Sequence, residues 1–207
     1  MTWWIWGLAL LAYAGFRAWY DSWSGPVTKE EIDGFFRRLE GTPSAAVNDM
    51  AVLRRFLEDD DGREFFMLNL VKFQAGEVAH PVTGRQVSGV ALMQQYMKAF
   101  VPSMLSRAGH PAMAARKIGG YIDSWNCTPD PGWTIVGYMR YRSRRDMMAL
   151  VAGPVFHEMH PFKIAGTAET FSFPTRPVVP LVGPRTWMAL VIALVASLAQ
   201  VAVLLAR

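Results

Sequence analysis

The longest apolar pattern lies near the C-terminus, where WMALVIALVASLAQVAVLLA (187–206) contains no charged residue. At about 1.5 Å of rise per helical residue, this segment is long enough to cross a hydrocarbon core of about 30 Å. The N-terminal segment is apolar from Trp3 to Phe16 and has aromatic residues at both ends, as membrane-crossing helices do. The pattern predicts transmembrane helices over 1–23 and 187–207.

A cleaved signal peptide is the alternative for the N-terminal segment, since Ala12-Tyr13-Ala14 has the small-x-small form of a cleavage site. No Lys or Arg precedes the apolar stretch, as a signal peptide normally requires, so a retained anchor is favoured. The basic residues near the predicted membrane helices lie mostly on the side of the central domain: Arg17, Lys29, Arg176 and Arg185. The positive-inside rule then predicts a two-pass protein of the bacterial inner membrane with a cytoplasmic central domain.

Between the membrane segments, residues 24–63 have apolar positions at helical spacing and predict a helical connector. Thr28-Lys-Glu-Glu31 has the form of a capping box that opens its first helix. A second helix is predicted around Met50–Leu57. The sequence that follows alternates between strand and helix patterns over 64–176, and 177–186 is predicted to be a linker.

The central pattern runs strand, helix, strand, strand, helix, strand. The predicted elements are strands over 64–73, 115–125, 132–143 and 169–174, a helix over 89–106, and a helix opened by Ser143 with a short continuation after Gly153-Pro154. This order predicts an α+β, ferredoxin-like βαββαβ domain, an antiparallel sheet with helices on one face. The other face would be too apolar to leave in water, which predicts a homodimer through the sheets.

Four segments of this domain resemble, in order and spacing, an uncharacterised bacterial domain family of the dimeric α+β barrel superfamily. They are FFMLNLVKF (65–73), TGRQVSGVALMQQY (83–96), GWTIVGYMRYRSRRDMMALVAGPVF (132–156) and HPFKIAGTAETFSF (160–173). Two positions depart from the family pattern: Tyr141-Arg142-Ser143 replaces Tyr-Pro-Ser, and Pro161-Phe162-Lys163 follows His160 where Arg is common. The resemblance implies an α+β barrel and a dimer, without a reaction, because fold does not fix function.

Asn69 interrupts the apolar run of the first predicted strand. Alternation along a strand places it on the same face as Phe65, Met67, Val71 and Phe73. A buried carboxamide costs free energy unless it is hydrogen-bonded. One interpretation is that Asn69 bonds a backbone group or specifies strand register. The other is that it projects into a cavity and bonds a ligand.

His157 and His160 are three residues apart and would share a face of a continuous helix, as metal-binding pairs do. The spacing is not the His-Glu-x-x-His of zinc proteases, and no metal site is predicted. Some haem-degrading monooxygenases of the superfamily use a first-strand Asn, a third-strand Trp and a helical His, which Asn69, Trp133 and either histidine resemble loosely. Cofactor-free quinone-type monooxygenases fit Asn69 with Trp133 or Tyr141 equally loosely. The cofactor is therefore unknown, with haem as the weaker suggestion.

A net charge of +4 at pH 7, part of it on Arg17 and Arg207, gives no electrostatic case for nucleic acid. The sequence contains no phosphate loop, nucleophile elbow or cysteine metal motif, and its single cysteine is Cys127. A basic cluster follows the third predicted strand and is predicted to be solvated or to contact anionic lipid headgroups: Arg140, Arg142, Arg144 and Arg145.

These features predict a membrane-anchored small-molecule-binding or assembly module that is an accessory component of a membrane complex. Its expected partners are membrane lipid, a second copy of the chain and subunits of that complex. The alternative is an oxygenase or isomerase acting on a lipophilic or aromatic small molecule, quinone-like or haem. The candidate ligand-binding residues are Asn69, Trp133, Tyr141, His157 and His160.

Overall fold

A computed structural model describes residues 2–179 and 182–206 of the chain. The chain forms two compact units, one of Ser24–Arg176 and one of the two end segments, Met1–Trp23 and Pro177–Arg207. Part of the predicted linker, at positions 180 and 181, lies outside the described residues, as do the outermost residues of the two predicted membrane segments, Met1 and Arg207.

The end segments form helices α1 (Trp3–Tyr20) and α8 (Pro184–Leu205), which pack against each other. The Trp6 indole Nε1 donates to Gln200 Oε1 at 2.6 Å. Within the described residues, α8 is the one helix long and apolar enough to cross a membrane, with a mean hydropathy of 2.6. Helix α1 does not meet the same test, since Trp, Tyr and Arg lower its hydropathy. Its crossing of a membrane stays a prediction.

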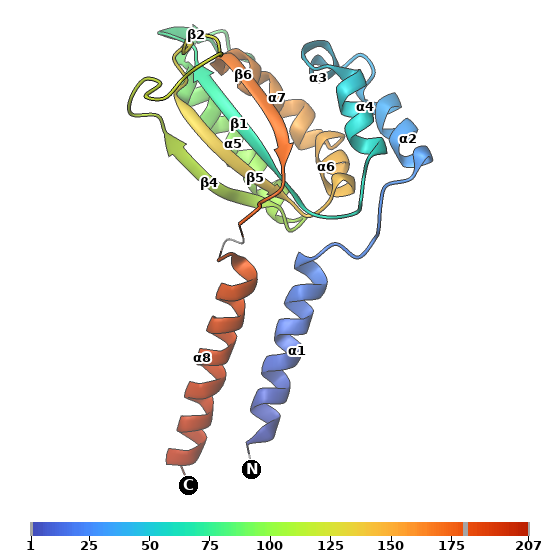
Figure 1. Ribbon diagram of the computed structural model, residues 1–207, viewed down its shortest axis with the longest axis vertical. Helices are drawn as coiled ribbons and strands as arrows, with labels where there is room; N and C mark the ends of the chain where they lie inside the picture. The colour runs from blue at the N-terminus through green and yellow to red at the C-terminus, as the bar shows by residue number, and fades with distance from the viewer. Residues whose placement is uncertain (1, 180–181, 207) are drawn as a thin grey trace. The chain divides into compact units, whose positions relative to one another are not determined.

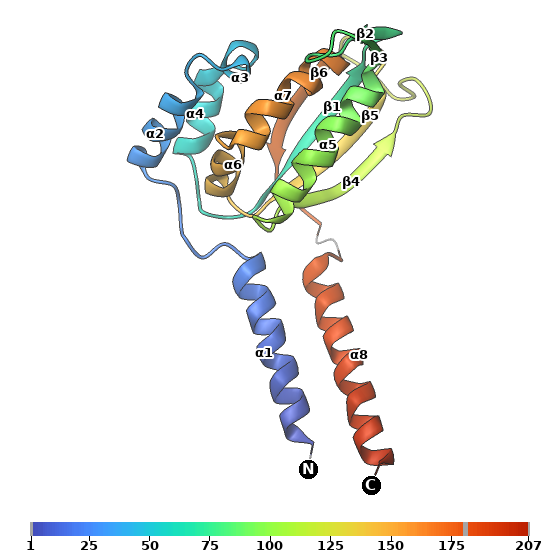
Figure 2. The same ribbon diagram turned by 180° about the vertical axis from the view of Figure 1, so that it is seen from behind.

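The larger unit is built on an antiparallel four-stranded sheet with strand order β4-β5-β1-β6. The strands are β1 (Phe65–Phe73), β4 (His110–Arg116), β5 (Ile135–Tyr141) and β6 (Thr167–Thr175). Helices α5 (Gly89–Leu105) and α7 (Pro154–Gly166) cover one face (Figure 2). In Figure 1 the strands lie in front of these helices, with no helix over the near face. The predicted α+β class with an antiparallel sheet is confirmed.

The segment before β1 forms α2 (Lys29–Leu39), α3 (Pro43–Val47) and α4 (Met50–Glu58). The predicted capping box is confirmed, because Thr28 Oγ1 accepts from the Glu31 N–H and Glu31 Oε2 accepts from the Thr28 N–H. Helix α3 was not predicted. Phe35 and Leu39 of α2 and Leu57 of α4 are buried in one core with side chains of the sheet and α5. These helices therefore belong to the same compact unit as the sheet.

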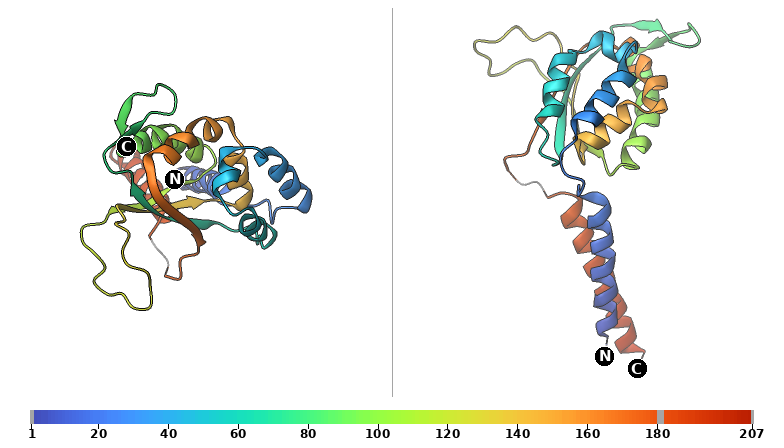
Figure 3. Two further views of the ribbon diagram at one scale, coloured as in Figure 1. Left: turned by 90° about the horizontal axis from the view of Figure 1, so that it is seen from above. Right: turned by 90° about the vertical axis from the view of Figure 1, so that its right-hand side faces the viewer.

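The second strand differs from its predicted position. It is His110–Arg116, and the predicted range 115–125 lies mostly in the loop between β4 and β5, which extends away from the sheet (Figure 3). Pro111 disfavours a predicted strand at this position, because proline has no N–H to donate to a neighbouring strand. In the structure β4 is an edge strand, where a proline is tolerated. A register shift between Pro111 and Met113 accommodates it. A short hairpin, β2 (Glu77–Ala79) with β3 (Gln86–Ser88), lies between β1 and α5 and was not predicted.

Helix α7 is longer than the short continuation expected after Gly153-Pro154. Pro154 occupies its first turn, as predicted, and the helix continues through Pro161 to Gly166. An internal proline removes one backbone hydrogen bond, but packing against α5 and burial of Phe156 and Phe162 hold the helix together. Helix α6 (Arg144–Val151) precedes it and is capped by Ser143, as expected from the sequence.

The basic cluster between β5 and α6 is directed into the protein. Arg140 is only 1% exposed, pairs with Glu64 at 2.6 Å and donates to the Ala108 carbonyl. The prediction that this residue belongs to a solvated or lipid-facing cluster is wrong, since its guanidinium has no access to a membrane surface. Arg142 pairs with Asp146 at 2.6 Å.

The two following arginines connect α6 to the N-terminal part of the same unit. Arg145 pairs with Glu31 at 2.7 Å and donates to the carbonyls of Gly25 and Pro26. Arg144 lies 3.3 Å from Asp60, and its guanidinium stacks over the Phe56 ring at 4.2 Å. These contacts fix α2 and α4 beside α6.

Two glycines set the distance between α5 and α7. A Cβ atom at Gly89 would lie 2.4 Å from the Gly166 carbonyl oxygen, and one at Gly166 would lie 2.6 Å from the Gly89 carbonyl oxygen. Both obstacles are backbone atoms, which cannot move aside as a flexible side chain can. Any side chain at either position would therefore separate the two helices.

We expect Gly166→Ala to lower the free energy of unfolding by about 1–3 kcal/mol, the usual cost of overpacking a core. Urea unfolding of the full chain in nonionic detergent, followed by tryptophan fluorescence, measures the change. Gly120→Ala is the matched control, since a Cβ there meets nothing within 4 Å. Equal stabilities for the two variants would contradict the proposed close approach.

Candidate functional site

A cavity of about 330 Å³ lies between the end of α3, the C-terminal half of α7 and strand β6. From α7 it is lined by His160, Lys163 and Ile164, with Thr167 directly after the helix. The three helical positions are related as i, i+3 and i+4, so they share one helix face, and Thr167 begins β6. The remaining lining residues are Val47, Asn48, Ala168, Glu169, Thr170, Phe171 and Ser172.

His160 is held rigidly at the base of this face. It is 8% exposed, its ring stacks on Phe156 at 4.5 Å between centroids, and its Nδ1 lies 2.8 Å from Ser44 Oγ. Burial, with smaller contributions from the charges of Lys163 and His157, lowers the pKa of His160 to about 4. The imidazole is therefore neutral near pH 7.

Lys163 and Thr167 contribute polar groups to the cavity that lack partners. Within the described part of the chain, Lys163 has no hydrogen bond and no ion pair, and burial lowers its pKa. Thr167 Oγ1 is buried and, among the same residues, has no hydrogen-bond partner. Buried polar groups are normally paired, so the unpaired Thr167 hydroxyl beside the half-buried Lys163 indicates a place for a ligand.

The carboxamide of Asn69 is bonded within the sheet. Its Nδ2 donates to the Met67 carbonyl at 2.9 Å, and its Oδ1 accepts from Ser172 Oγ at 2.8 Å. Ser172 also lines the cavity, so Asn69 lies one hydrogen bond away from it. These contacts favour the interpretation in which Asn69 serves the sheet, with an indirect connection to the cavity wall.

The other candidates are distributed over the domain. Trp133 packs edge-on against Phe171 at 5.1 Å and donates from Nε1 to the Tyr121 hydroxyl at 3.0 Å. Tyr141 is in the core, stacked on Phe65 at 5.1 Å, and burial raises its pKa. The structure therefore brings His160 to the cavity, places Asn69 against Ser172 of its wall, and leaves Trp133 and Tyr141 elsewhere.

His157 is on the same helix as His160 but is not among the residues lining the cavity. Its ring contacts Phe156 at 6.4 Å. In the described residues, no group of three or more His, Cys, Asp or Glu side chains could hold a metal ion. Lys163 and Thr167 were not among the candidates from sequence. Their spacing from His160 identifies them only if α7 is expected to continue past Pro161.

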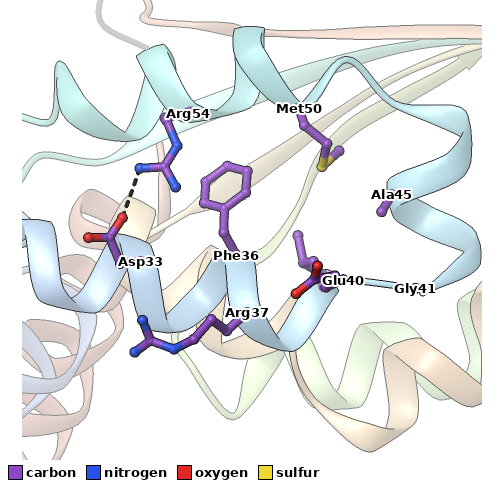
Figure 4. A pocket seen from close by; sticks show the side chains of 9 residues that line it. Asp33, Phe36, Arg37, Glu40, Gly41, Ala45, Met50 and Arg54 are labelled. Atoms are coloured by element: carbon purple, nitrogen blue, oxygen red, sulfur yellow. Dashed lines mark hydrogen bonds and ion pairs between the residues drawn. The ribbon is translucent and has the colours of Figure 1, made fainter.

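A second hollow, of about 520 Å³, lies among α2, α3 and α4 (Figure 4). Phe36 and Met50 line it, and Arg54 crosses it to pair with Asp33 at 2.9 Å while stacking over Phe36 at 4.4 Å. Its polar contacts are thus made within the protein, and it contains no buried unpaired group like those of the β6–α7 cavity.

The face of the sheet opposite α5 and α7 is apolar. On β1, the residues that alternate with the core residues Phe65 and Met67 point to this face: Phe66, Leu68 and Leu70. The strand register places side chains of the other strands beside them: Met113, Val136, Tyr138, Phe171 and Phe173. Phe173 is 45% exposed and Met113 is 50% exposed. Phe171 and Phe173 stack on each other at 6.0 Å. The Lys72–Glu169 pair, at 2.6 Å, lies at one end of the face.

No known family matches this chain, and no curated protein matches it. Among solved structures, the chain is similar to RPA0582, a protein of unknown function from Rhodopseudomonas palustris. The TM-score is 0.54 and the sequence identity is 20%, and the match covers 64% of this chain and 96% of RPA0582. The methylated form of RPA0582 gives a TM-score of 0.55 and 21% identity over 64% and 94%. At this identity the likeness shows a shared fold. At3g17210 from Arabidopsis thaliana covers 57% of this chain and 99% of its own, at 12% identity and a TM-score of 0.37, which is too low to support an argument.

The depressed pKa of His160 predicts a specific loss of stability in mild acid. The unfolded chain takes up the proton near the ordinary histidine pKa of about 6.5, and the folded chain does so only near 4. The contribution of neutral His160 is thus complete above about pH 6.5 and is lost, by about 1–3 kcal/mol, as the pH falls toward 4.

Urea unfolding of the full chain at several pH values tests this. We expect His160→Gln to be less stable than the natural chain at pH 7.5, and we expect the difference to shrink as the pH approaches 4. The same substitution at the less buried His157 provides the control. A difference that stays constant from pH 7.5 to 4.5 would show that His160 does not titrate as its burial indicates.

Proposed function

We propose that this chain is a membrane-anchored assembly module that self-associates through the uncovered face of a ferredoxin-like α+β domain. The strand order β4-β5-β1-β6, with α5 between β1 and β4 and with α6 and α7 between β5 and β6, corresponds to a βαββαβ arrangement. The shared fold with RPA0582 supports treating this arrangement as a domain of its own. Membership of the dimeric α+β barrel superfamily is part of the proposal.

The observation that carries the proposal is the apolar sheet face. Half-exposed Phe173 and Met113 lie on it together with Phe171, and exposed apolar patches of this kind mark interaction sites. The charged residues that the register places on it are already paired, Lys72 with Glu169 and Arg140 with Glu64, so among the described residues the face offers no free charge that would select a charged partner. A second copy presents an equally apolar sheet, and two such sheets pack face to face at about 10 Å.

The end helices give the proposal its membrane anchor. Helix α8 has the length and hydropathy of a span, and α1 packs on it with a hydrogen bond between Trp6 and Gln200, a polar side chain within the apolar segment of α8. Two spans per chain, with the domain on the cytoplasmic side, restrict the copies to a plane and raise their effective concentration. Lipid and other subunits of a membrane complex are the remaining proposed partners.

An oxygenase or isomerase acting on a lipophilic or aromatic molecule is the second candidate. The hydrogen bond between Asn69 and Ser172, a residue of the cavity wall, favours it. The enzyme is the less favoured of the two functions, because the Asn69 carboxamide is already bonded in the sheet and Tyr141 is buried in the core. Haem or quinol turnover by the purified chain, lost in Asn69→Ala, would instead establish the enzyme.

Replacing Phe173 with lysine tests the sheet interface. Because a charge on each facing sheet would be buried without a partner, we expect Phe173→Lys to convert a dimer into monomers without loss of secondary structure. Light scattering of the full chain in nonionic detergent measures the mass. Val82→Lys, which adds the same charge at a 76% exposed hairpin position, should remain dimeric. A natural chain that is monomeric at all concentrations would refute the interface.

The single Cys127 provides a test of topology. It is exposed, and it lies in the loop between β4 and β5. We expect a membrane-impermeant maleimide to leave it unlabelled in intact spheroplasts and to label it after lysis, with Cys127→Ser as the blank. Labelling of intact spheroplasts would place the domain outside the cytoplasm and contradict the positive-inside argument.

A further inference from the structure

The polar groups of the β6–α7 cavity lack a matching negative charge. Lys163 has no ion pair among the described residues. The acidic residue lining the same cavity is Glu169, and its carboxylate already binds Lys72 at 2.6 Å. A partly buried ammonium without a partner is costly, and an anion placed beside it would remove that cost.

The other unpaired groups at this site are suited to donating hydrogen bonds. Thr167 Oγ1 has a hydroxyl proton and no partner within the described chain. Nδ1 of His160 is occupied by the Ser44 hydroxyl, and when Ser44 donates to Nδ1, the ring proton lies on Nε2 and makes Nε2 a donor. The Asn48 Nδ2 is engaged with the Ser44 carbonyl at 2.7 Å and so helps to hold this arrangement.

The rest of the lining has polar and apolar residues, and the hydroxyls of Thr170 and Ser172 are already bonded to the Leu70 carbonyl and to Asn69. Val47, Ile164 and Ala168 provide hydrophobic surface. The volume of about 330 Å³ is near the lower end of the range of about 300–1,000 Å³ for small-molecule sites. One cationic group, two neutral donors and apolar walls are complementary to a single anionic head on a small apolar body.

We propose that this cavity is a binding site for a small monocarboxylic acid, with the carboxylate held by Lys163, Thr167 and His160 and the apolar body against Ile164 and Val47. An aromatic acid and a short-chain fatty acid share this chemistry. The site goes beyond the proposed assembly function and does not depend on it, since Phe173 of the dimer face is not part of the cavity lining. A chain that fails to dimerise could still bind the acid, and a chain that fails to bind the acid could still dimerise.

Isothermal titration of the full chain in nonionic detergent with benzoate and with octanoate tests the site. Benzyl alcohol and octanol, which lack the charge, serve as matched probes. We expect saturable binding of at least one acid, tighter than its alcohol by about tenfold or more, because the charge-assisted bonds to Lys163 are absent from the alcohol. Which acid binds more tightly distinguishes a soluble aromatic acid from a lipid-derived one.

Three variants connect the binding to the cavity. Lys163→Met should weaken acid binding by about tenfold or more and leave alcohol binding unchanged, and Thr167→Val should weaken it severalfold. Lys98→Met, at an exposed position of α5, is the matched control and should bind as the natural chain does. Thr167→Val keeps the test valid if Lys163→Met does not fold.

Three outcomes would overturn the proposal: no saturable binding of either acid, equal binding of acid and alcohol, or acid binding that survives both cavity substitutions. Phe173→Lys should still bind the acid, so a failed dimer interface and a failed ligand site give different results.

Discussion

The structure depends on one physical constraint: its sheet is apolar on both faces, and the chain covers only one of them. On β1, Phe65 and Met67 pack into the core beneath α5 and α7, while Leu68 and Leu70 point to the opposite face. Alternation along a strand makes these two sets inseparable, since a register shift would exchange them. Leu68 is already buried by its neighbours, but Phe171 and Phe173 on the same face are 44% and 45% exposed, and their burial requires a surface from outside the chain. We therefore propose that self-association covers this face and that the end helices bring copies together.

The covered face also explains where a cavity can form. The direct backbone contact between Gly89 and Gly166 brings α5 and α7 close at one end. The arginines at the start of α6 hold α2 and α4 against the same unit, through Glu31 and Asp60. Helix α3 is thereby placed near the edge strand β6, and the space between them and α7 is lined by His160, Lys163 and Thr167. The packing of the helices thus produces both a rigid histidine and an ammonium without a counter-charge.

The sequence predicts the elements whose signals are local. The capping box, the first strand and the proline at the start of α7 follow from residues adjacent to one another. It does not predict β4, because Pro111 is tolerated only through an edge position and a register shift that involve the neighbouring strand. It misses Lys163 and Thr167 for a related reason: continuation of α7 past Pro161 depends on packing against α5. Asn69 was recognised as unusual, but its partners, Met67 and Ser172, become evident only with the strands paired.

Solvent accessibility of the apolar face tests the central claim most directly. Met113 is 50% exposed in the single chain, whereas Met104 is 1% exposed in the core. Hydroxyl-radical footprinting of the purified full chain in nonionic detergent, read by mass spectrometry, compares their oxidation. If a second copy covers the sheet, Met113 will be protected nearly as well as Met104. Oxidation of Met113 at a rate typical of an open surface methionine would contradict the account.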